Sequence, residues 1–160
     1  MLTHRGIEAN PDKCKAITEI RSPKNLKEIQ LLLDRLMALS RFIPRLAERM
    51  RPIAQMLRKT AKFSCNEECE TIFTQLKEFL SPPAAIQKPR TDLPIVVYLA
   101  VLEEAANAAL VQDINNEEHP VYFVSRTFQV AETRYQMIEK VTLTLVLTAK
   151  RMLLEWMALN

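Results

Sequence analysis

Two runs rich in β-branched and aromatic residues lie in the second half of the chain, over residues 94–101 and 120–125, and a third, mainly apolar run lies between them over residues 105–111. Over residues 132–156, apolar side chains recur at alternating spacings of three and four, which is typical of an α-helix with one buried face. The pattern predicts a three-stranded antiparallel meander followed by a long helix that packs on it. The stripe expected to face the sheet is Tyr135, Ile138, Thr142, Leu145, Ala149, Met152 and Trp156.

The first half of the chain has helical periodicity that prolines interrupt. Asn10-Pro11 and Ser22-Pro23 each have the form of an N-cap followed by proline at the first helical position. They predict one helix from residue 11 and a second over residues 23–39. Residues 41–59 contain two further prolines and are predicted as two short helices.

A capping box and a proline-rich stretch mark the end of this half. Ser64 with Glu67 predicts a helix over residues 65–80. Four of the nine prolines then fall within residues 82–94, which is typical of a linker. The chain is therefore predicted to be α+β, with helices over residues 1–80, a linker over 81–93 and a sheet-and-helix domain over 94–160.

Composition excludes several classes of protein. With 160 residues, 48% of them hydrophobic, the chain is expected to fold around a core. Its single glycine, Gly6, excludes a glycine-rich nucleotide loop. Cys14, Cys65 and Cys69 form no CxxC pair, so no zinc site is predicted. The sequence shows neither a signal peptide nor an apolar run of membrane-spanning length, so we expect a soluble intracellular protein, in the cytoplasm or the nucleus.

The basic residues are concentrated in the helical half. The net charge is +3, but residues 1–80 hold fifteen Lys and Arg against ten Asp and Glu, whereas residues 81–160 hold seven against nine. Arg41, Arg45 and Arg49 at spacings of four would form a row that contacts successive phosphates, although such a row can also be a solvated face. The candidate nucleic-acid-binding residues are Arg41, Arg45, Arg49, Arg51, Arg58 and Lys59.

Five ordered blocks between residues 4 and 151 resemble the pol polyprotein of gypsy-type LTR retrotransposons, most of all plant elements. The blocks are HRGIEANPDKCKAI, PKNLKEIQLLLDRLMALSRFIPRL, CNEECETIFTQLKEFLSPP, LPIVVYLA and HPVYFVSRTFQVAETRYQMIEKVTLTLVLTAKR. The resemblance implies that the first three blocks are the reverse-transcriptase thumb and connecting helices, which grip the primer-template. The last two would open an RNase H-like domain, which we expect to be truncated after its first long helix.

The resemblance also implies that catalytic residues of the family are missing. The polymerase YxDD centre, whose carboxylates hold two Mg²⁺ ions, would precede these blocks. The first RNase H metal ligand, the Asp of a TDAS-like motif, falls on Leu99 or Ala100, and the second, a Glu of an EKELLAIV-like motif, falls on Val141. The remaining ligands would follow Asn160. The carboxylates that could substitute are Glu103, Glu104, Asp113, Glu132 and Glu139, of which Glu139 lies about 200° around the helix from Val141.

These features lead to three functional hypotheses. The first is a catalytically inactive module without a metal cofactor, which tethers neighbouring domains or binds an RNA/DNA or DNA duplex without sequence preference. The second is a protein-protein interaction module, because Leu143, Leu147 and Leu154 make the long helix apolar outside its main stripe. The third is a residual ribonuclease for RNA-DNA hybrids within a larger polyprotein. The expected partners are nucleic-acid duplexes, polymerase or nuclease domains, and a second copy of the chain, but no membrane.

Overall fold

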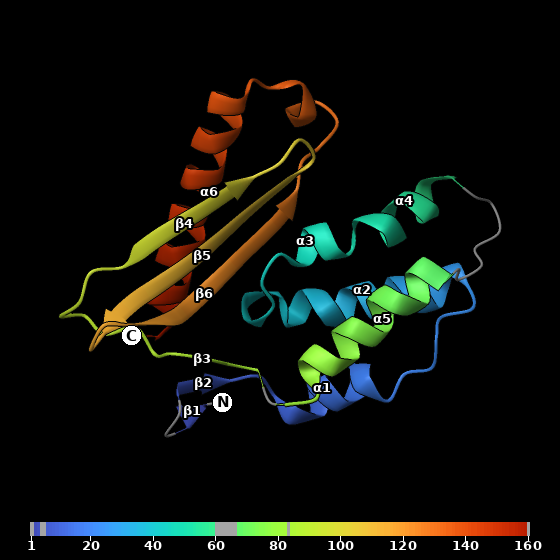
Figure 1. Cartoon of the computed structure of the whole chain (residues 1–160), viewed down its shortest axis with the longest axis horizontal. Helices are drawn as coiled ribbons and strands as arrows, with labels where there is room; N and C mark the ends of the chain where they lie inside the picture. Colours follow the sequence, from blue (N-terminus) through green and yellow to red (C-terminus); the bar gives the residue numbers. More distant parts are fainter. Residues whose placement is uncertain (1, 4–5, 60–66, 83, 160) are drawn as a thin grey trace. The chain divides into compact units, whose positions relative to one another are not determined.

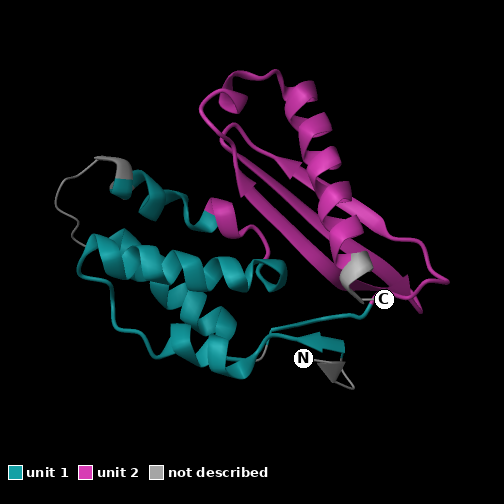
Figure 2. Cartoon of the chain, turned by 180° about the vertical axis from the view of Figure 1, so that it is seen from behind, with its two compact units in different colours: residues 1–43, 49–88 teal, residues 44–48, 89–160 magenta. Residues whose placement is uncertain are grey.

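The structure, a computed structural model, describes residues 2–3, 6–59, 67–82 and 84–159 (Figure 1). It divides into two compact units, shown in Figure 2. Unit 1 comprises Met1–Ile43 and Arg49–Lys88, and unit 2 comprises Pro44–Glu48 and Pro89–Asn160. The combination of helices with antiparallel sheets confirms the predicted α+β class.

Unit 1 is mainly helical. It contains α1 (Pro11–Thr18), α2 (Leu26–Ala38), α4 (Arg51–Lys59) and α5 (Glu67–Leu80), with a 3-10 turn, η1 (Ser40–Phe42), after α2. Helix α1 packs against both α2 and α5, so the apolar faces of the helices meet in one core. Its most deeply buried side chains are Ile17, Ile29, Leu32, Leu36, Leu39, Ile43, Ile53, Phe73, Leu76 and Leu80.

One of the two predicted proline caps is confirmed and the other is wrong. Asn10 caps α1, because its side chain accepts from the Asp12 amide at 2.8 Å and Pro11 follows it. Helix α2 instead begins at Leu26 and is capped by Asn25, whose side chain accepts from the Glu28 amide at 3.0 Å. The Ser22 hydroxyl donates to the Glu70 carboxylate at 2.6 Å, so a partner distant in sequence takes it away from the helix terminus.

Unit 1 also contains a small antiparallel sheet that the sequence did not predict. Its strands are β1 (Leu2–Thr3), β2 (Gly6–Glu8) and β3 (Ala85–Ile86), in that order. Gly6 has a φ of +121°, and a Cβ there would collide with the Ile86 carbonyl oxygen, so the contact requires glycine. Strand β3 lies within the stretch predicted as a linker. The predicted cap Ser64 and the start of its helix lie outside the described residues.

The sheet of unit 2 confirms the predicted meander. Strands β4 (Val96–Val101), β5 (Ala105–Ile114) and β6 (Glu117–Thr127) pair antiparallel in the order β4-β5-β6. The last two strands are longer than predicted because Asn115 and Asn116, both at positive φ, form a two-residue hairpin turn. A register shift between Leu110 and Val111 marks a β-bulge near that end.

The long helix of unit 2 presents a different face to the sheet from the one predicted. Helix α6 (Met137–Leu159) follows a 3-10 turn, η2 (Glu132–Arg134), and packs on β4 and β5. Ile138 and Leu145, expected to be buried, are 68% and 50% exposed. The buried positions are instead Lys140, Thr144 and Thr148.

The polar groups on this buried face are satisfied locally. The Thr144 and Thr148 hydroxyls donate to carbonyl oxygens one turn earlier, at 2.6 and 2.8 Å. The Lys140 ammonium donates to the Glu103 carbonyl oxygen at 2.9 Å. The apolar stripe of α6 is left on the surface as a result. Among the described residues, we find no helix with the length and hydropathy needed to span a membrane.

Candidate functional site

The two candidate positions for the first metal ligand lie on opposite faces of the sheet. Tyr122 in β6 donates to Glu155 of α6 at 3.4 Å, so the face that carries Tyr122 is the one covered by α6. Tyr122 pairs with Leu110, and Leu110 pairs with Val97. Because side chains alternate along a strand, Leu99 lies on this covered face and Ala100 on the other. Leu99 is therefore the position that shares a face with the helix.

The second ligand position is also apolar. Val141 lies in the first turns of α6, half-buried, next to the buried Lys140. Glu139 is exposed and accepts from the Gln136 amide at 2.8 Å, so this carboxylate caps the helix and lies away from the sheet. The two ligand positions thus carry an isobutyl group, at Leu99 on the covered face of the sheet, and an isopropyl group, at Val141 on α6.

The carboxylates considered as substitutes are dispersed over unit 2. Glu103 is exposed in the β4–β5 turn, whereas Asp113 is exposed near the opposite end of β5. Glu132 lies beyond β6 and is held by Arg126, whose Nη2 donates to its two oxygens at 2.8 and 3.0 Å. In the part of the chain that the structure describes, no three His, Cys, Asp or Glu side chains are grouped so that they could hold a metal ion.

Glu132 has a structural role at the start of the helical segment. The Gln129 amide donates to its carboxylate at 2.7 Å, and this hydrogen bond together with Arg126 lowers the pKa of Glu132 below its usual value, against the opposing effect of burial. The carboxylate is therefore ionised at neutral pH, where it fixes the turn after β6 to the strand.

Arg41, Arg45 and Arg49 do not lie on one helix, since prolines interrupt this segment as predicted. Arg41 lies in η1, Arg45 in a turn at φ +56°, and Arg49 at the end of α3 (Leu46–Arg49). Arg41 and Arg49 lie over the rings of Phe42 and Phe79, at 5.2 and 5.4 Å from the ring centroids. Arg51 is exposed at the start of α4, and the side chains of Arg58 and Lys59 lie outside the described residues. Binding of nucleic acid by these residues stays a prediction.

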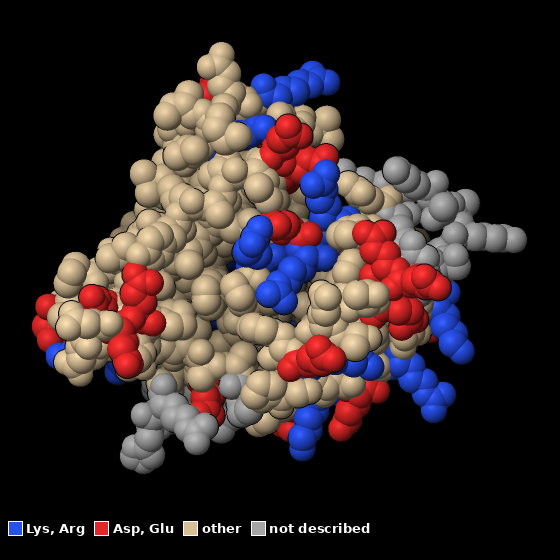
Figure 3. All heavy atoms as spheres, viewed as in Figure 1, with Lys and Arg blue, Asp and Glu red and all other residues tan. Residues whose placement is uncertain are grey.

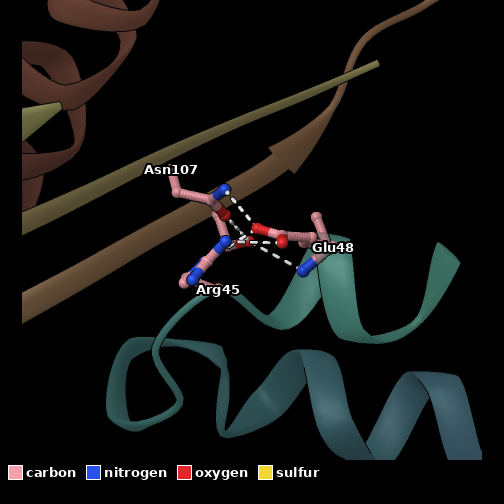
Figure 4. A network of polar contacts seen from close by, with 5 residues as sticks. Arg45, Glu48 and Asn107 are labelled. Atoms are coloured by element: carbon pink, nitrogen blue, oxygen red, sulfur yellow. Dashed lines mark hydrogen bonds and ion pairs between the residues drawn. The ribbon is translucent and has the colours of Figure 1, made fainter. Parts of the chain in front are cut away.

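A polar network holds the segment Pro44–Glu48 to the sheet of unit 2 (Figure 4). Arg45 donates from Nη2 and Nε to the two oxygens of Glu48, at 2.6 and 2.8 Å. The Asn107 amide nitrogen approaches Glu48 Oε2 at 3.5 Å, and Asn107 Oδ1 accepts from the Ser125 hydroxyl at 2.7 Å. That hydroxyl in turn accepts from the Ala47 amide at 2.7 Å. The network occupies the face of the sheet opposite α6.

One residue of the sequence, Asn107, is by itself a sign of this network. Asn107 is a polar residue inside the apolar run of β5, and it is only 3% exposed. A buried amide needs hydrogen-bond partners, so its presence in a strand indicates that another segment covers it. Which segment this is depends on the tertiary fold, because Glu48 lies 59 positions before Asn107 in the chain.

The surface charge of the helical part is mixed. On the face seen in Figure 3, Lys and Arg side chains are interspersed with Asp and Glu over these helices. Glu48 beside Arg45 is an example of an acidic group next to a basic one. Such a surface favours weak and salt-sensitive contacts with phosphates.

Comparison with known sequences gives one family and a set of long polyproteins. The sequence profile of the RNase H-like domain found in reverse transcriptase matches residues 65–153. The retrovirus-related Pol polyprotein from transposon 297 of Drosophila melanogaster is 31% identical over 151 residues, which is 94% of this chain. The chain spans only 14% of the length of that polyprotein.

Solved structures share the fold. A foamy viral protease-reverse transcriptase in complex with an RNA/DNA hybrid superposes with a TM-score of 0.75 at 18% identity, over 94% of this chain and 20% of that one. A foamy viral protease-reverse transcriptase (dRH) in complex with double-stranded DNA gives a TM-score of 0.74 at 18% identity, over 95% of this chain and 27% of that one. Both likenesses concern the arrangement of helices and strands.

Proposed function

Because the chain belongs to the family of RNase H-like domains found in reverse transcriptases, we propose that it is a non-cutting module of a retrotransposon pol polyprotein. In this role it holds a nucleic-acid duplex or tethers a polymerase domain to a nuclease domain. It carries out no metal-dependent chemistry of its own. Its partners are RNA/DNA or DNA duplexes, bound through the phosphate backbone, and the neighbouring domains of the polyprotein.

The observation that carries this proposal is the apolar chemistry of the ligand positions. Two Mg²⁺ ions beside a scissile phosphate need several anionic oxygen ligands. Leu99 lies on the sheet face covered by α6, and Val141 lies on α6 itself, so neither position supplies an oxygen. The dispersed carboxylates of Glu103, Asp113 and Glu132 do not replace them.

Duplex binding is supported by the relatives and by the charge distribution. The two foamy viral structures with the same fold hold double-stranded DNA and an RNA/DNA hybrid. The helical residues 1–80 carry the excess of positive charge, fifteen basic against ten acidic residues. Phosphate contacts from such residues position a protein on a duplex without reading its sequence.

The finer assignments rest on the sequence blocks. We assign residues 1–80 to thumb- and connection-like helices, 81–93 to a linker and 94–160 to the RNase H-like domain. The division of the structure at Lys88 and Pro89 falls within the assigned linker and supports a boundary there, although Pro44–Glu48 packs with the second unit. The family match begins earlier, at residue 65. The order and spacing of the five blocks support an element of gypsy type, and a plant element is proposed on the resemblance of these blocks alone.

An interaction module is the second candidate function. The observation that favours it is the exposed apolar stripe of α6, in which Ile138, Leu145 and Leu153 are 68%, 50% and 59% exposed. Exposed apolar patches of this kind mark contacts with other proteins. The residual ribonuclease is the third candidate, and it predicts the opposite outcome of the cleavage experiment below.

The first expected result concerns cleavage. The purified chain should not cut the RNA strand of an RNA/DNA hybrid in Mg²⁺ or Mn²⁺ above the level of a mock purification, because Leu99 and Val141 cannot anchor the ions. The measurement is gel analysis of an end-labelled hybrid. Metal-dependent cutting that disappears in a Glu103→Gln, Glu104→Gln or Asp113→Asn variant would contradict the proposal and favour the ribonuclease.

The second expected result concerns binding. Affinity for a DNA duplex or an RNA/DNA hybrid should fall steeply with salt and be independent of sequence. Replacing Arg41, Arg45 and Arg49 with glutamine should flatten the slope of log affinity against log salt by about 2 to 3, at about 0.9 per phosphate contact. Fluorescence anisotropy over a salt series measures this slope.

The matched control for binding is Arg134→Gln, which removes an exposed arginine from η2, outside the basic segment. It should leave the slope within about 0.9 of the parent value, the contribution of one contact. An unchanged slope in the triple variant would show that the three arginines form a solvated surface. Because Arg45 is held by Glu48, Arg45→Gln alone should contribute least of the three.

A further inference from the structure

Helix α6 lies on one face of the sheet of unit 2 (Figure 2). It carries an uncharged stripe on the side that faces away from this sheet. At 100° per residue the members of this outer stripe fall within an arc of about 100°. Four of them are large apolar side chains that are at least 50% exposed, with Ile138 at 68% and Leu153 at 59%. The outer stripe consists of Ile138, Thr142, Leu145, Val146, Ala149 and Leu153, all of them exposed.

The outer stripe is self-complementary when a second copy of the helix runs antiparallel to it. A two-fold axis between Leu145 and Val146 places Leu145 against Val146 of the other copy and Ile138 against Leu153. The same axis places Thr142 against Ala149, and these small side chains allow the two helices to approach closely. A stripe with spacings of four, three and four is also the pattern of a coiled-coil seam.

Charges at the border of the outer stripe match the same arrangement. Glu139 and Lys150 are both exposed and lie on one flank of the stripe, about 20° apart around the helix. In an antiparallel pair each flank faces the same flank of the other copy. Glu139 then lies near Lys150 of the second copy, and the symmetry repeats the pair. A parallel pair would instead place this flank against the opposite flank of the other copy, where Val141 and Met152 offer no charge to pair with.

We propose that this face of α6 is an interface between two copies of the chain, which form an antiparallel two-helix contact. The occupant is a second copy because the apolar positions and the charged positions are both self-complementary about one axis. The contact lies on the surface of α6 opposite the sheet, so it leaves the fold of unit 2 unchanged.

The first arm of the test is the oligomeric state of the full chain. Sedimentation velocity at about 50 μM should show a dimer, since a micromolar dissociation constant gives mostly dimer at that concentration. Leu145→Glu should raise the dissociation constant at least about 100-fold, because it buries two carboxylates beside the axis. Val130→Glu, at a position that is 71% exposed outside the helix, is the matched control and should leave the dimer intact.

The second arm tests the orientation of the helices. Glu139→Lys and Lys150→Glu should each weaken the dimer about three- to tenfold, because exposed ion pairs contribute little singly and the symmetry repeats the pair. The double reversal should restore the parent affinity. A monomer, a polydisperse aggregate, or a double variant as weak as the two single ones would overturn the proposal. Circular dichroism of each variant distinguishes loss of the contact from loss of the fold.

Discussion

Replacing Gln112 with leucine is expected to lower the free energy of unfolding of unit 2 by about 3 kcal/mol, because it leaves three backbone groups without their partner. Gln112 is fully buried in β5. Its side-chain oxygen accepts from the Arg90 amide at 2.8 Å, and its nitrogen donates to the carbonyl oxygens of Arg90 and Leu93 at 2.8 and 2.9 Å. One carboxamide therefore fixes the chain that leads into β4.

The measurement is amide hydrogen exchange of β5 residues over a urea series, which follows unit 2 by itself. Gln112→Glu is the informative second variant, because it keeps the shape but directs a carboxylate oxygen at two carbonyl oxygens. It should be strongly destabilising at neutral pH and partly recover when the carboxyl is protonated in acid. Gln136→Leu, at an exposed glutamine, is the matched control. A loss below about 0.5 kcal/mol in Gln112→Leu, the range of ordinary surface substitutions, would contradict this role.

Replacing Asn107 with leucine is expected to cost about 2 kcal/mol and to release the segment Pro44–Glu48 from the sheet. The substitution removes the acceptor for the Ser125 hydroxyl and the amide that approaches Glu48. Both groups would be left beside an apolar side chain in a buried position. Faster exchange of the Ala47 amide, which donates to Ser125, is the direct sign that the segment has been released.

A double variant shows whether the network acts as a unit. Ser125→Ala alone removes the acceptor of the Ala47 amide, and combined with Asn107→Leu it removes both partners of one hydrogen bond. The double variant should then lose less free energy of unfolding than the sum of the losses of the two single variants, by at least about 0.5 kcal/mol. Strict additivity, with unchanged exchange at Ala47, would show that Asn107 is only a packed strand residue. Thr127→Leu, at an exposed position at the end of β6, controls for the change of a polar to an apolar side chain.

Much of unit 2 was predictable because local rules and tertiary packing agree there. Runs of Val, Ile, Tyr and Phe favour the strands β4 and β6, and the apolar run between them forms β5. Asn10-Pro11 opened α1 as expected, because the side chain of Asn10 needs only the adjacent amides. The sequence blocks also led to the reverse-transcriptase family, which the match over residues 65–153 supports.

The candidate site was predictable in its chemistry but not in its geometry. The sequence alone shows that no carboxylate is present at Leu99, Ala100 or Val141. The assignment of Leu99 to the sheet face under α6 required the strand register. The three arginines spaced by four residues share no helix face, because Pro44 and the left-handed turn at Arg45 interrupt the segment, and the prolines had indicated this interruption. A periodic spacing implies a shared face only where one continuous helix connects the residues.

The sequence alone determined that there is a meander followed by a long helix, because these elements follow from period and propensity. Which side of α6 is buried was decided only by the tertiary structure. The helix is apolar on most sides, so its period does not select a face. The face with Lys140, Thr144 and Thr148 is buried because the carbonyl oxygen of Glu103 and the helix's own backbone satisfy those polar groups. The hydrogen bonds of Ser22, Asn107 and Gln112 were likewise decided by the tertiary structure, because their partners are distant in the sequence. A polar group can be buried only where such partners are available.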